Sequence, residues 1–99
     1  MKNLKETIPF MTSADYKERF IAEYWQLKIR YEKLRTFNAN IEIARLYSSE
    51  RQEYIEPEHD CPYALLKEQQ KVMGELLHIL EMRAIIENIS LDVTNEERA

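Results

Sequence analysis

Apolar side chains recur at helical spacing through the first half of the chain. Large apolar residues between positions 16 and 34 are separated by steps of four, four, three, four and three: Tyr16, Phe20, Tyr24, Leu27, Tyr31 and Leu34. At about 100° per residue they share one face of a helix. Thr12 and Ser13, with Asp15 close behind, are typical of a helix start. The spacing therefore predicts a long helix over residues 13–37.

A second long helix is predicted over residues 62–88. Pro62 fits its first turn, where a missing N–H costs no hydrogen bond, and Glu56-Pro57 interrupts any helix before it. Its apolar residues spread over an arc of roughly 160°, wide enough to contact two neighbouring helices: Leu65, Leu66, Val72, Met73, Leu76, Leu77, Ile79, Leu80 and Ala84.

The segment between these helices, residues 38–61, permits two interpretations. Asn38 and Asn40 are weak helix formers and favour an end of the first helix near Asn38. Ile43, Tyr47 and Tyr54 return at helical spacing and favour a further helix or a bent continuation.

The predicted fold is all-α: an antiparallel hairpin of two long helices with a middle helical segment. Residues 1–12 are expected to form an N-terminal arm, residues 13–89 the helical hairpin domain, and residues 90–99 a flexible acidic tail.

The far face of the first helix carries a second apolar stripe, formed by Ile21, Trp25 and Ile29. A helix in a simple hairpin needs only one such stripe, so either another segment or another copy of the chain must cover the second. We favour another copy. A homo-oligomer is therefore expected, assembled through these three residues and through the wide face of the second helix.

Composition and charge narrow the function classes. The 99 residues carry a net charge of −4, so duplex nucleic acid is a poor partner. A single Gly excludes a glycine-rich phosphate loop. Apolar runs are too short for a membrane span, and the lone Cys61 rules out an internal disulfide and favours a reducing, cytoplasmic setting. No nucleophile and base are spaced as in a catalytic triad, so we expect no enzyme and no cofactor.

A basic flank on the first helix is the first candidate site. Residues 13–35 carry six basic against four acidic side chains, and Arg19, Arg30 and Lys33 lie close together in angle. In an oligomer two such flanks could clamp a phosphate, with Trp25 or a tyrosine such as Tyr16 as a stacking face. The favoured alternative is a solvated flank with surface ion pairs.

Polar residues within the apolar arc of the second helix are the next candidates. Gln69 and Arg83 stand where a simple core would place Leu, and Arg83 can pair with Glu87 at i, i+4. Setting the register or the oligomeric state is the favoured role, and contact with a ligand or partner is the alternative.

Two patterns resemble metal ligands, and neither predicts a metal site. Glu75 and His78 have the Glu-x-x-His spacing of di-iron bundles, but they lie on the polar side of their helix. The consecutive side chains of His59, Asp60 and Cys61 cannot all converge on one ion, and a loop with a helix cap explains them.

The two long helices together resemble a family of small phage proteins known from crAss-like phages and from phages of Gram-positive bacteria. The resemblance rests on Asp15-Tyr16-x-x-Arg19-Phe20-Ile21-x-Glu23-Tyr24-x-x-Leu27-x-x-Arg30-Tyr31-x-x-Leu34, Cys61-Pro62-x-x-Leu65-Leu66-x-x-Gln69-x-x-x-Met73 and Leu80-Glu81-x-Arg83. It implies a phage accessory protein in an infected host cell. In size and helical plan the chain is also similar to the hairpin sponges with which phages sequester cyclic nucleotide signals.

Three functions follow as expectations. The first is a phage counter-defence protein that sequesters a small anionic signal such as a cyclic nucleotide. The second is an inhibitor or adaptor that binds a defence or host protein through its helices and its acidic residues 36–61. The third is a structural coiled-coil module.

Overall fold

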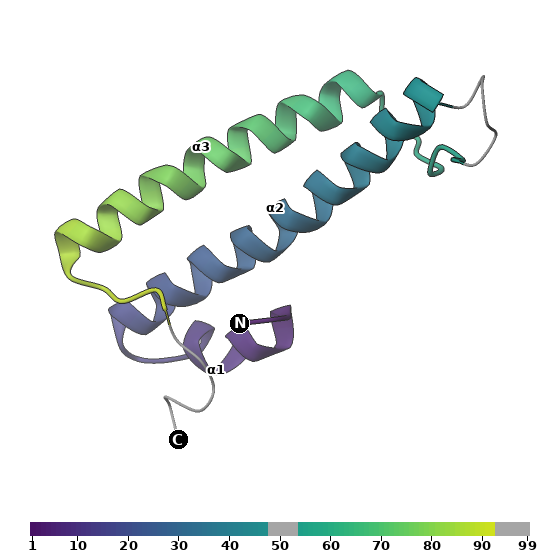
Figure 1. Cartoon of the computed structure of the whole chain (residues 1–99). Coiled ribbons are helices and arrows are strands. Elements are labelled where there is room, and N and C mark those ends of the chain that lie inside the picture. Colours follow the sequence, from purple (N-terminus) through teal and green to yellow (C-terminus); the bar gives the residue numbers. More distant parts are fainter. Residues whose placement is uncertain (48–53, 93–99) are drawn as a thin grey trace.

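A computed structural model describes residues 1–47 and 54–92, which form four helical elements and contain no strand. A short 3₁₀-helix, η1 (Leu4–Thr7), leads into α1 (Ile8–Met11). The long helices α2 (Tyr16–Tyr47) and α3 (Tyr63–Glu87) lie side by side and run in opposite directions (Figure 1). This confirms the all-α hairpin. The molecule is a rod of 53 × 26 × 21 Å, and no described helix is long and apolar enough to cross a membrane.

The seam between α2 and α3 supplies most of the core. Phe20 and Tyr24 of α2 pack with Leu80 and Ala84 of α3, and all four are buried. The hydroxyl of Tyr24 donates to Oε2 of Glu81 at 2.8 Å. Burial, together with this hydrogen bond to a carboxylate, raises the pKa of Tyr24 to about 12. The hydroxyl therefore stays protonated and keeps its role as a donor at neutral pH.

Gly74 allows the two helices to approach closely near the middle of the seam. A Cβ atom at this position would lie 3.3 Å from Cε1 of Tyr31, closer than carbon atoms normally pack. The only glycine of the chain thus makes room for an aromatic ring of the opposite helix.

The first long helix does not end near Asn38, which corrects the boundary expected at residue 37. It continues without interruption to Tyr47, as the alternative interpretation had it. Asn38 is almost wholly buried, and its Nδ2 donates to the carbonyl oxygen of Leu66 at 3.2 Å and to Oε1 of Gln70 at 2.9 Å. An asparagine whose side-chain nitrogen is paired across the helix seam does not compete for the backbone groups of its own helix, so the helix continues through it. Residues 48–53 of the middle segment lie outside the described residues.

The N-terminal residues are not a free arm, because they fold back onto the far face of α2 (Figure 1). Phe10 is 2% exposed and belongs to the same core as Ile21 and Ala22. Gln26 reinforces this contact, since its Nε2 donates to Oγ1 of the buried Thr7 at 3.1 Å. The predicted boundary at residue 12 therefore falls inside one packed unit.

This packing corrects the reason given for self-association through the second stripe, and self-association itself stays a prediction. Ile21 and Ile29 are each 7% exposed within a single chain. The indole Nε1 of Trp25 donates to the carbonyl oxygen of Leu91 at 2.7 Å. The sequence left two candidates to cover this stripe, another segment or another copy of the chain. In the structure, other segments of the same chain lie against these residues. Little of the stripe is left open to a second copy, apart from the part around the half-buried Trp25.

The chain after α3 is also held in place. Asn88 ends the helix in the left-handed conformation, with φ of 56°, and Ile89 is buried. Since Leu91 accepts the hydrogen bond from Trp25, the first residues of the expected flexible tail belong to the packed unit. Residues 93–99 lie outside the described residues.

Residues 54–61 are fastened to the end of α2 by a polar cluster. Arg45 binds the Glu56 carboxylate with two nitrogens, at 2.8 and 3.3 Å. His59 sits between two acceptors: its Nε2 lies 2.9 Å from Oε2 of Glu56, and its Nδ1 lies 2.6 Å from the carbonyl oxygen of Cys61. Hydrogen bonds to Arg45 and then to His59 lower the pKa of Glu56 to about 2. The acceptors at Cys61 and Glu56 raise the pKa of His59, because only an imidazolium donates to both.

Phe10→Ala is expected to lower the free energy of unfolding by about 3–5 kcal/mol, as for other buried phenylalanines. Ile8→Ala, in the same segment but 48% exposed, is the matched control and should have a much smaller effect. Urea denaturation followed by circular dichroism measures both. Equal, small losses would contradict the packing of the N-terminal residues on α2.

His59→Gln is expected to flatten the pH dependence of stability above the ordinary imidazole pKa. The raised pKa in the folded state means that the stabilisation from His59 is complete below pH 6.5 and is lost as the pH rises through the folded value. Wild-type melting temperature should therefore fall more between slightly acid and slightly alkaline pH than that of the variant. His78→Gln, on the exposed surface of α3, should behave as wild type. Identical pH profiles for wild type and His59→Gln would contradict the two-acceptor arrangement.

Candidate functional site

A cavity of about 300 Å³ lies on the far face of α2, where the first residues of the chain cross it. It is lined by five residues on successive turns of α2 and by two N-terminal residues: Trp25, Lys28, Ile29, Glu32, Lys33, Met1 and Lys2. Positions three and four apart on a helix are neighbours on its surface, which brings the α2 residues together. The volume is at the lower end of the range for small-molecule sites.

Trp25 forms a fixed apolar wall of this cavity. Its indole N–H is used in the hydrogen bond to Leu91, and its ring meets the ring of Tyr24 edge to face, with centroids 5.4 Å apart and planes at 87°. The ring is therefore held from two sides. What it can offer a ligand is an aromatic surface rather than a hydrogen-bond donor.

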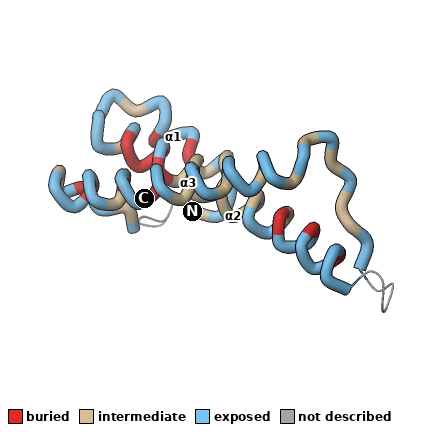
Figure 2. Tube along the Cα trace, turned by 90° about the horizontal axis from the view of Figure 1, so that it is seen from above, coloured by how far each residue is buried: buried red, intermediate tan, exposed pale blue. Residues whose placement is uncertain are grey.

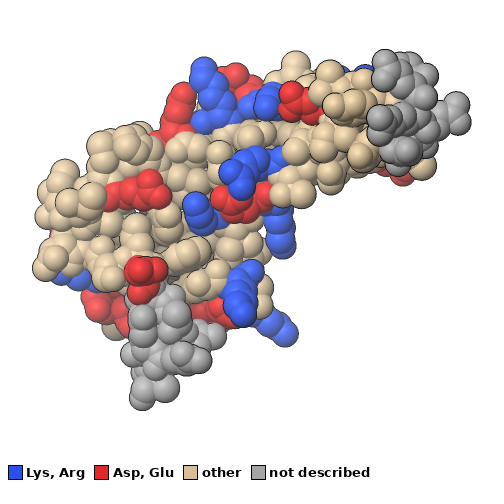
Figure 3. Space-filling model, viewed as in Figure 1, with Lys and Arg blue, Asp and Glu red and all other residues tan. Residues whose placement is uncertain are grey.

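The cavity is positively charged although the whole chain is acidic. Three lysines line it against one carboxylate. Glu32 is already engaged, since its oxygens lie 2.7 Å from Nη2 of Arg35 and 3.6 Å from Nζ of Lys28. No described residue lies within ion-pair distance of Lys33, which is exposed at the rim. On the face shown in Figure 3, by comparison, basic and acidic side chains are intermixed.

An aromatic surface beside several ammonium groups suits an anionic ligand with a flat ring. Ammonium groups bind phosphate as point charges, and aromatic side chains stack on nucleobases. Within residues 1–47 and 54–92 no group of three or more His, Cys, Asp or Glu side chains is placed to hold a metal ion. Glu75 and His78 are both exposed on α3.

The structure places the residues of the predicted basic flank at different sites. Trp25 and Lys33 lie at the cavity. Arg19 turns instead to the start of α2, where its Nη1 donates to the carbonyl oxygen of Ser13 at 2.9 Å. Arg30 is exposed and does not line the cavity. The three basic residues grouped by helical angle therefore do not form one site within a single chain.

Tyr16 and Arg83 meet at a separate place, where the start of α2 contacts the end of α3. The Tyr16 hydroxyl donates to Oε1 of Glu87 at 2.8 Å and accepts from Nη2 of Arg83 at 2.8 Å. Arg83 also binds Glu87 at 3.1 Å, which confirms the expected i, i+4 pair, and its guanidinium lies 5.0 Å from the centre of the Phe20 ring. These hydrogen bonds, with the one from Tyr16 foremost, lower the pKa of Glu87. The cluster fastens the two helices together, whereas Gln69 stays exposed on α3.

Three charged residues of the cavity were missed from the sequence: Lys2, Lys28 and Glu32. Lys28 and Glu32 follow Trp25 at helical spacing and could have been found on that basis. Lys2 gave no such signal, because its place depends on how the N-terminal residues pack on α2.

The fold and the cavity together define a small all-helical protein whose described residues form an aromatic, positively charged recess. A family model described as Sequestin matches residues 14–86, which span both long helices. The chain belongs to the Sequestin family. The family name denotes sequestration, which agrees with the likeness in size and helical plan to small sequestering proteins and does not bear on the resemblance to a phage family. No curated protein and no solved structure matches the chain.

Proposed function

We propose that this chain is a phage counter-defence protein that sequesters a small anionic signal, a cyclic nucleotide, without turning it over. The observation that carries the proposal is the cavity in which the ring of Trp25 stands among the lysines 2, 28 and 33. Membership of the Sequestin family supports the sequestering part. The phage origin and the nucleotide rest on the sequence resemblance and on the chemistry of the cavity.

Each part of a cyclic nucleotide has a counterpart in the cavity. The face of the Trp25 ring stacks on a base, an interaction worth about 1–3 kcal/mol. Lys28 and Lys33, on successive turns of α2, reach a phosphate with their ammonium groups. Lys2 adds a third ammonium group from the N-terminal residues. Since the cavity is small, part of a cyclic di- or trinucleotide remains in solvent.

Sequestration requires only that the protein binds the signal tightly and in a fixed stoichiometry. A protein that holds a signal with a dissociation constant below the concentration needed to activate a receptor lowers the free signal by mass action. No acid, base or nucleophile has to be positioned for this. The two ammonium groups and the fixed indole, all on one rigid helix, are suited to it because little order must be created on binding.

Isothermal titration calorimetry with a panel of cyclic mono-, di- and trinucleotides tests the proposal. Wild-type protein is expected to bind at least one of them with one ligand per chain. Lys28→Gln with Lys33→Gln should weaken binding at least about tenfold, because each substitution removes a charged hydrogen-bond donor worth about 1.5–3 kcal/mol.

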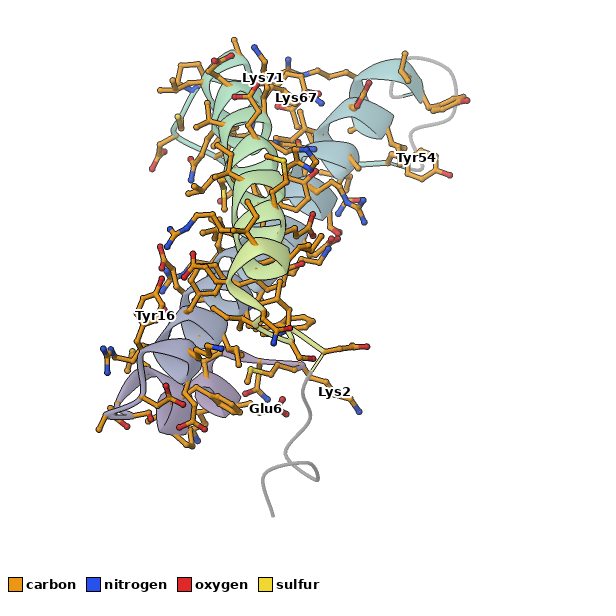
Figure 4. All side chains as sticks on the ribbon, turned by 90° about the vertical axis from the view of Figure 1, so that its left-hand side faces the viewer. Lys2, Glu6, Tyr16, Tyr54, Lys67 and Lys71 are labelled. Carbon is orange, nitrogen blue, oxygen red and sulfur yellow. The ribbon has the colours of Figure 1, made fainter. Side chains whose placement is uncertain are left out.

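Lys67→Gln with Lys71→Gln is the matched control. It removes the same charge, and Figure 4 shows both lysines on α3 at the opposite end of the molecule from Lys2. Its affinity should stay within about twofold of wild type. No heat with any nucleotide at tens of micromolar protein would contradict the proposal, as would equal losses in both double variants. Native mass spectrometry of protein purified from signalling cells would show a retained ligand directly.

A further inference from the structure

Of the described residues that line the cavity, Glu32 alone carries a carboxylate. It stands among Lys28, Lys33 and Lys2, and the last of these comes from the first residues of the chain, which lie beside α2 in both Figure 1 and Figure 2. A carboxylate in this place weakens the attraction of the cavity for a phosphate. Its use to a ligand must therefore lie in hydrogen bonds to a part other than the phosphate.

Glu32 lies two turns after Trp25 on the same side of α2. The seven residues between them correspond to about 10 Å along the helix axis and to a difference of about 20° in angle. A helical side chain leans toward the N-terminus of its helix, so the carboxylate of Glu32 reaches back toward the turn of Lys28 and Ile29, which also line the cavity. The cavity thus offers a flat ring a stacking surface at one end and a hydrogen-bond acceptor at the other.

The ion pairs of Glu32 leave part of its carboxylate available to a ligand. Oε2 lies 2.7 Å from Nη2 of Arg35, which does not line the cavity, so this contact restricts the side chain from outside. Oε1 lies 3.6 Å from Nζ of Lys28, beyond the distance of a hydrogen bond. Since an ionised carboxylate has about four acceptor positions, both oxygens can still accept a hydrogen bond.

A pair of carboxylate oxygens distinguishes guanine from the other common nucleobases. Guanine has two adjacent donors on its Watson–Crick edge, the N1–H and the N2 amino group. Adenine and cytosine each have an amino group beside an unprotonated ring nitrogen, and uracil has one N–H between two carbonyl oxygens. On these three bases, one carboxylate oxygen would face another acceptor. A carboxylate at the edge of a stacked base therefore selects guanine.

We propose that Glu32 makes the cavity specific for a guanine nucleotide. The base stacks on Trp25, its N1–H and its N2 amino group donate to the two oxygens of Glu32, and the lysines hold the phosphate. These charge-assisted hydrogen bonds offset the repulsion between the carboxylate and the phosphate. Because it names the ligand of the same cavity, this specificity rests on the proposed function.

Calorimetry with matched pairs of nucleotides tests the specificity of the wild-type protein. Cyclic GMP is compared with cyclic AMP, and cyclic di-GMP with cyclic di-AMP. The guanine member of a pair should bind at least about tenfold more tightly, because the adenine member leaves a carboxylate oxygen without a donor. Cyclic IMP, which lacks the N2 amino group, should fall between cyclic GMP and cyclic AMP. Trp25 is the only tryptophan of the chain, so quenching of its fluorescence reports stacking of the base.

Glu32→Gln should move the preference from guanine toward adenine. A carboxamide has one acceptor and one donor, which match the amino group and N1 of adenine but not the two donors of guanine. Loss of the negative charge should strengthen the binding of both nucleotides alike, so the ratio of their dissociation constants is the readout. This ratio should change at least about tenfold. Far-UV circular dichroism should show unchanged helix content, since Gln and Glu have similar helix propensities.

Glu23→Gln is the matched control. Glu23 is exposed on the same helix, about 160° away from Trp25 in angle, and does not line the cavity. The substitution removes the same charge at a similar level of α2. It should leave the ratio for each pair within about twofold of the wild-type value.

Several results would overturn the guanine specificity while leaving the proposed function intact. They are equal affinities within a pair, a preference for adenine, and failure of both guanine members to bind when another nucleotide does. A ratio that Glu32→Gln leaves unchanged would also overturn it, including the case in which the carboxylate binds the ribose and both affinities fall together. Absence of binding with every nucleotide would contradict the proposed function and the guanine specificity with it.

Discussion

The structure depends on one constraint: α2 is apolar on two opposite faces, and both must be removed from water. The seam through Phe20 and Tyr24 is covered by α3, and the stripe through Ile21 is covered by the N-terminal residues. A hairpin alone would leave the second face exposed. The chain instead returns over it from both ends, with Phe10 on one side and Leu91 on the other. A small rod-like protein thereby gains a core that two helices cannot supply.

The cavity is a product of the same constraint. The N-terminal residues cover the second stripe incompletely, and a recess remains where Trp25 and Ile29 meet Lys2. Its indole wall is rigid because the chain beyond α3 accepts the indole N–H. Its positive charge comes from lysines that extend from the edges of the apolar stripe, where long side chains can bury their stems and keep the ammonium group in water. Packing and the proposed binding therefore use the same residues.

Asn38 shows how the seam is kept in register. Its amide nitrogen makes two hydrogen bonds to α3, while its Oδ1 has no partner among the described residues. A buried, unpaired acceptor lowers the free energy of unfolding by about 1–3 kcal/mol. A leucine at the same position would not cause this loss. Single asparagines in helix seams fix register and orientation at a cost in stability. The hydrogen bonds to Leu66 and Gln70 fit this role, because a shift of α3 along α2 would leave the whole amide unpaired.

Local patterns by themselves determined the all-α class, the two long helices, the seam of α2 and the pair of Arg83 with Glu87. Each of these depends on spacing within one helix, and helical periodicity is a property of neighbouring residues. Only the tertiary structure decided what covers the stripe of Ile21, why Asn38 continues its helix, and which lysines share a cavity with Trp25. Those outcomes depend on contacts between residues far apart in the chain. Periodicity shows that a helix face must be buried, but it does not show which segment covers that face.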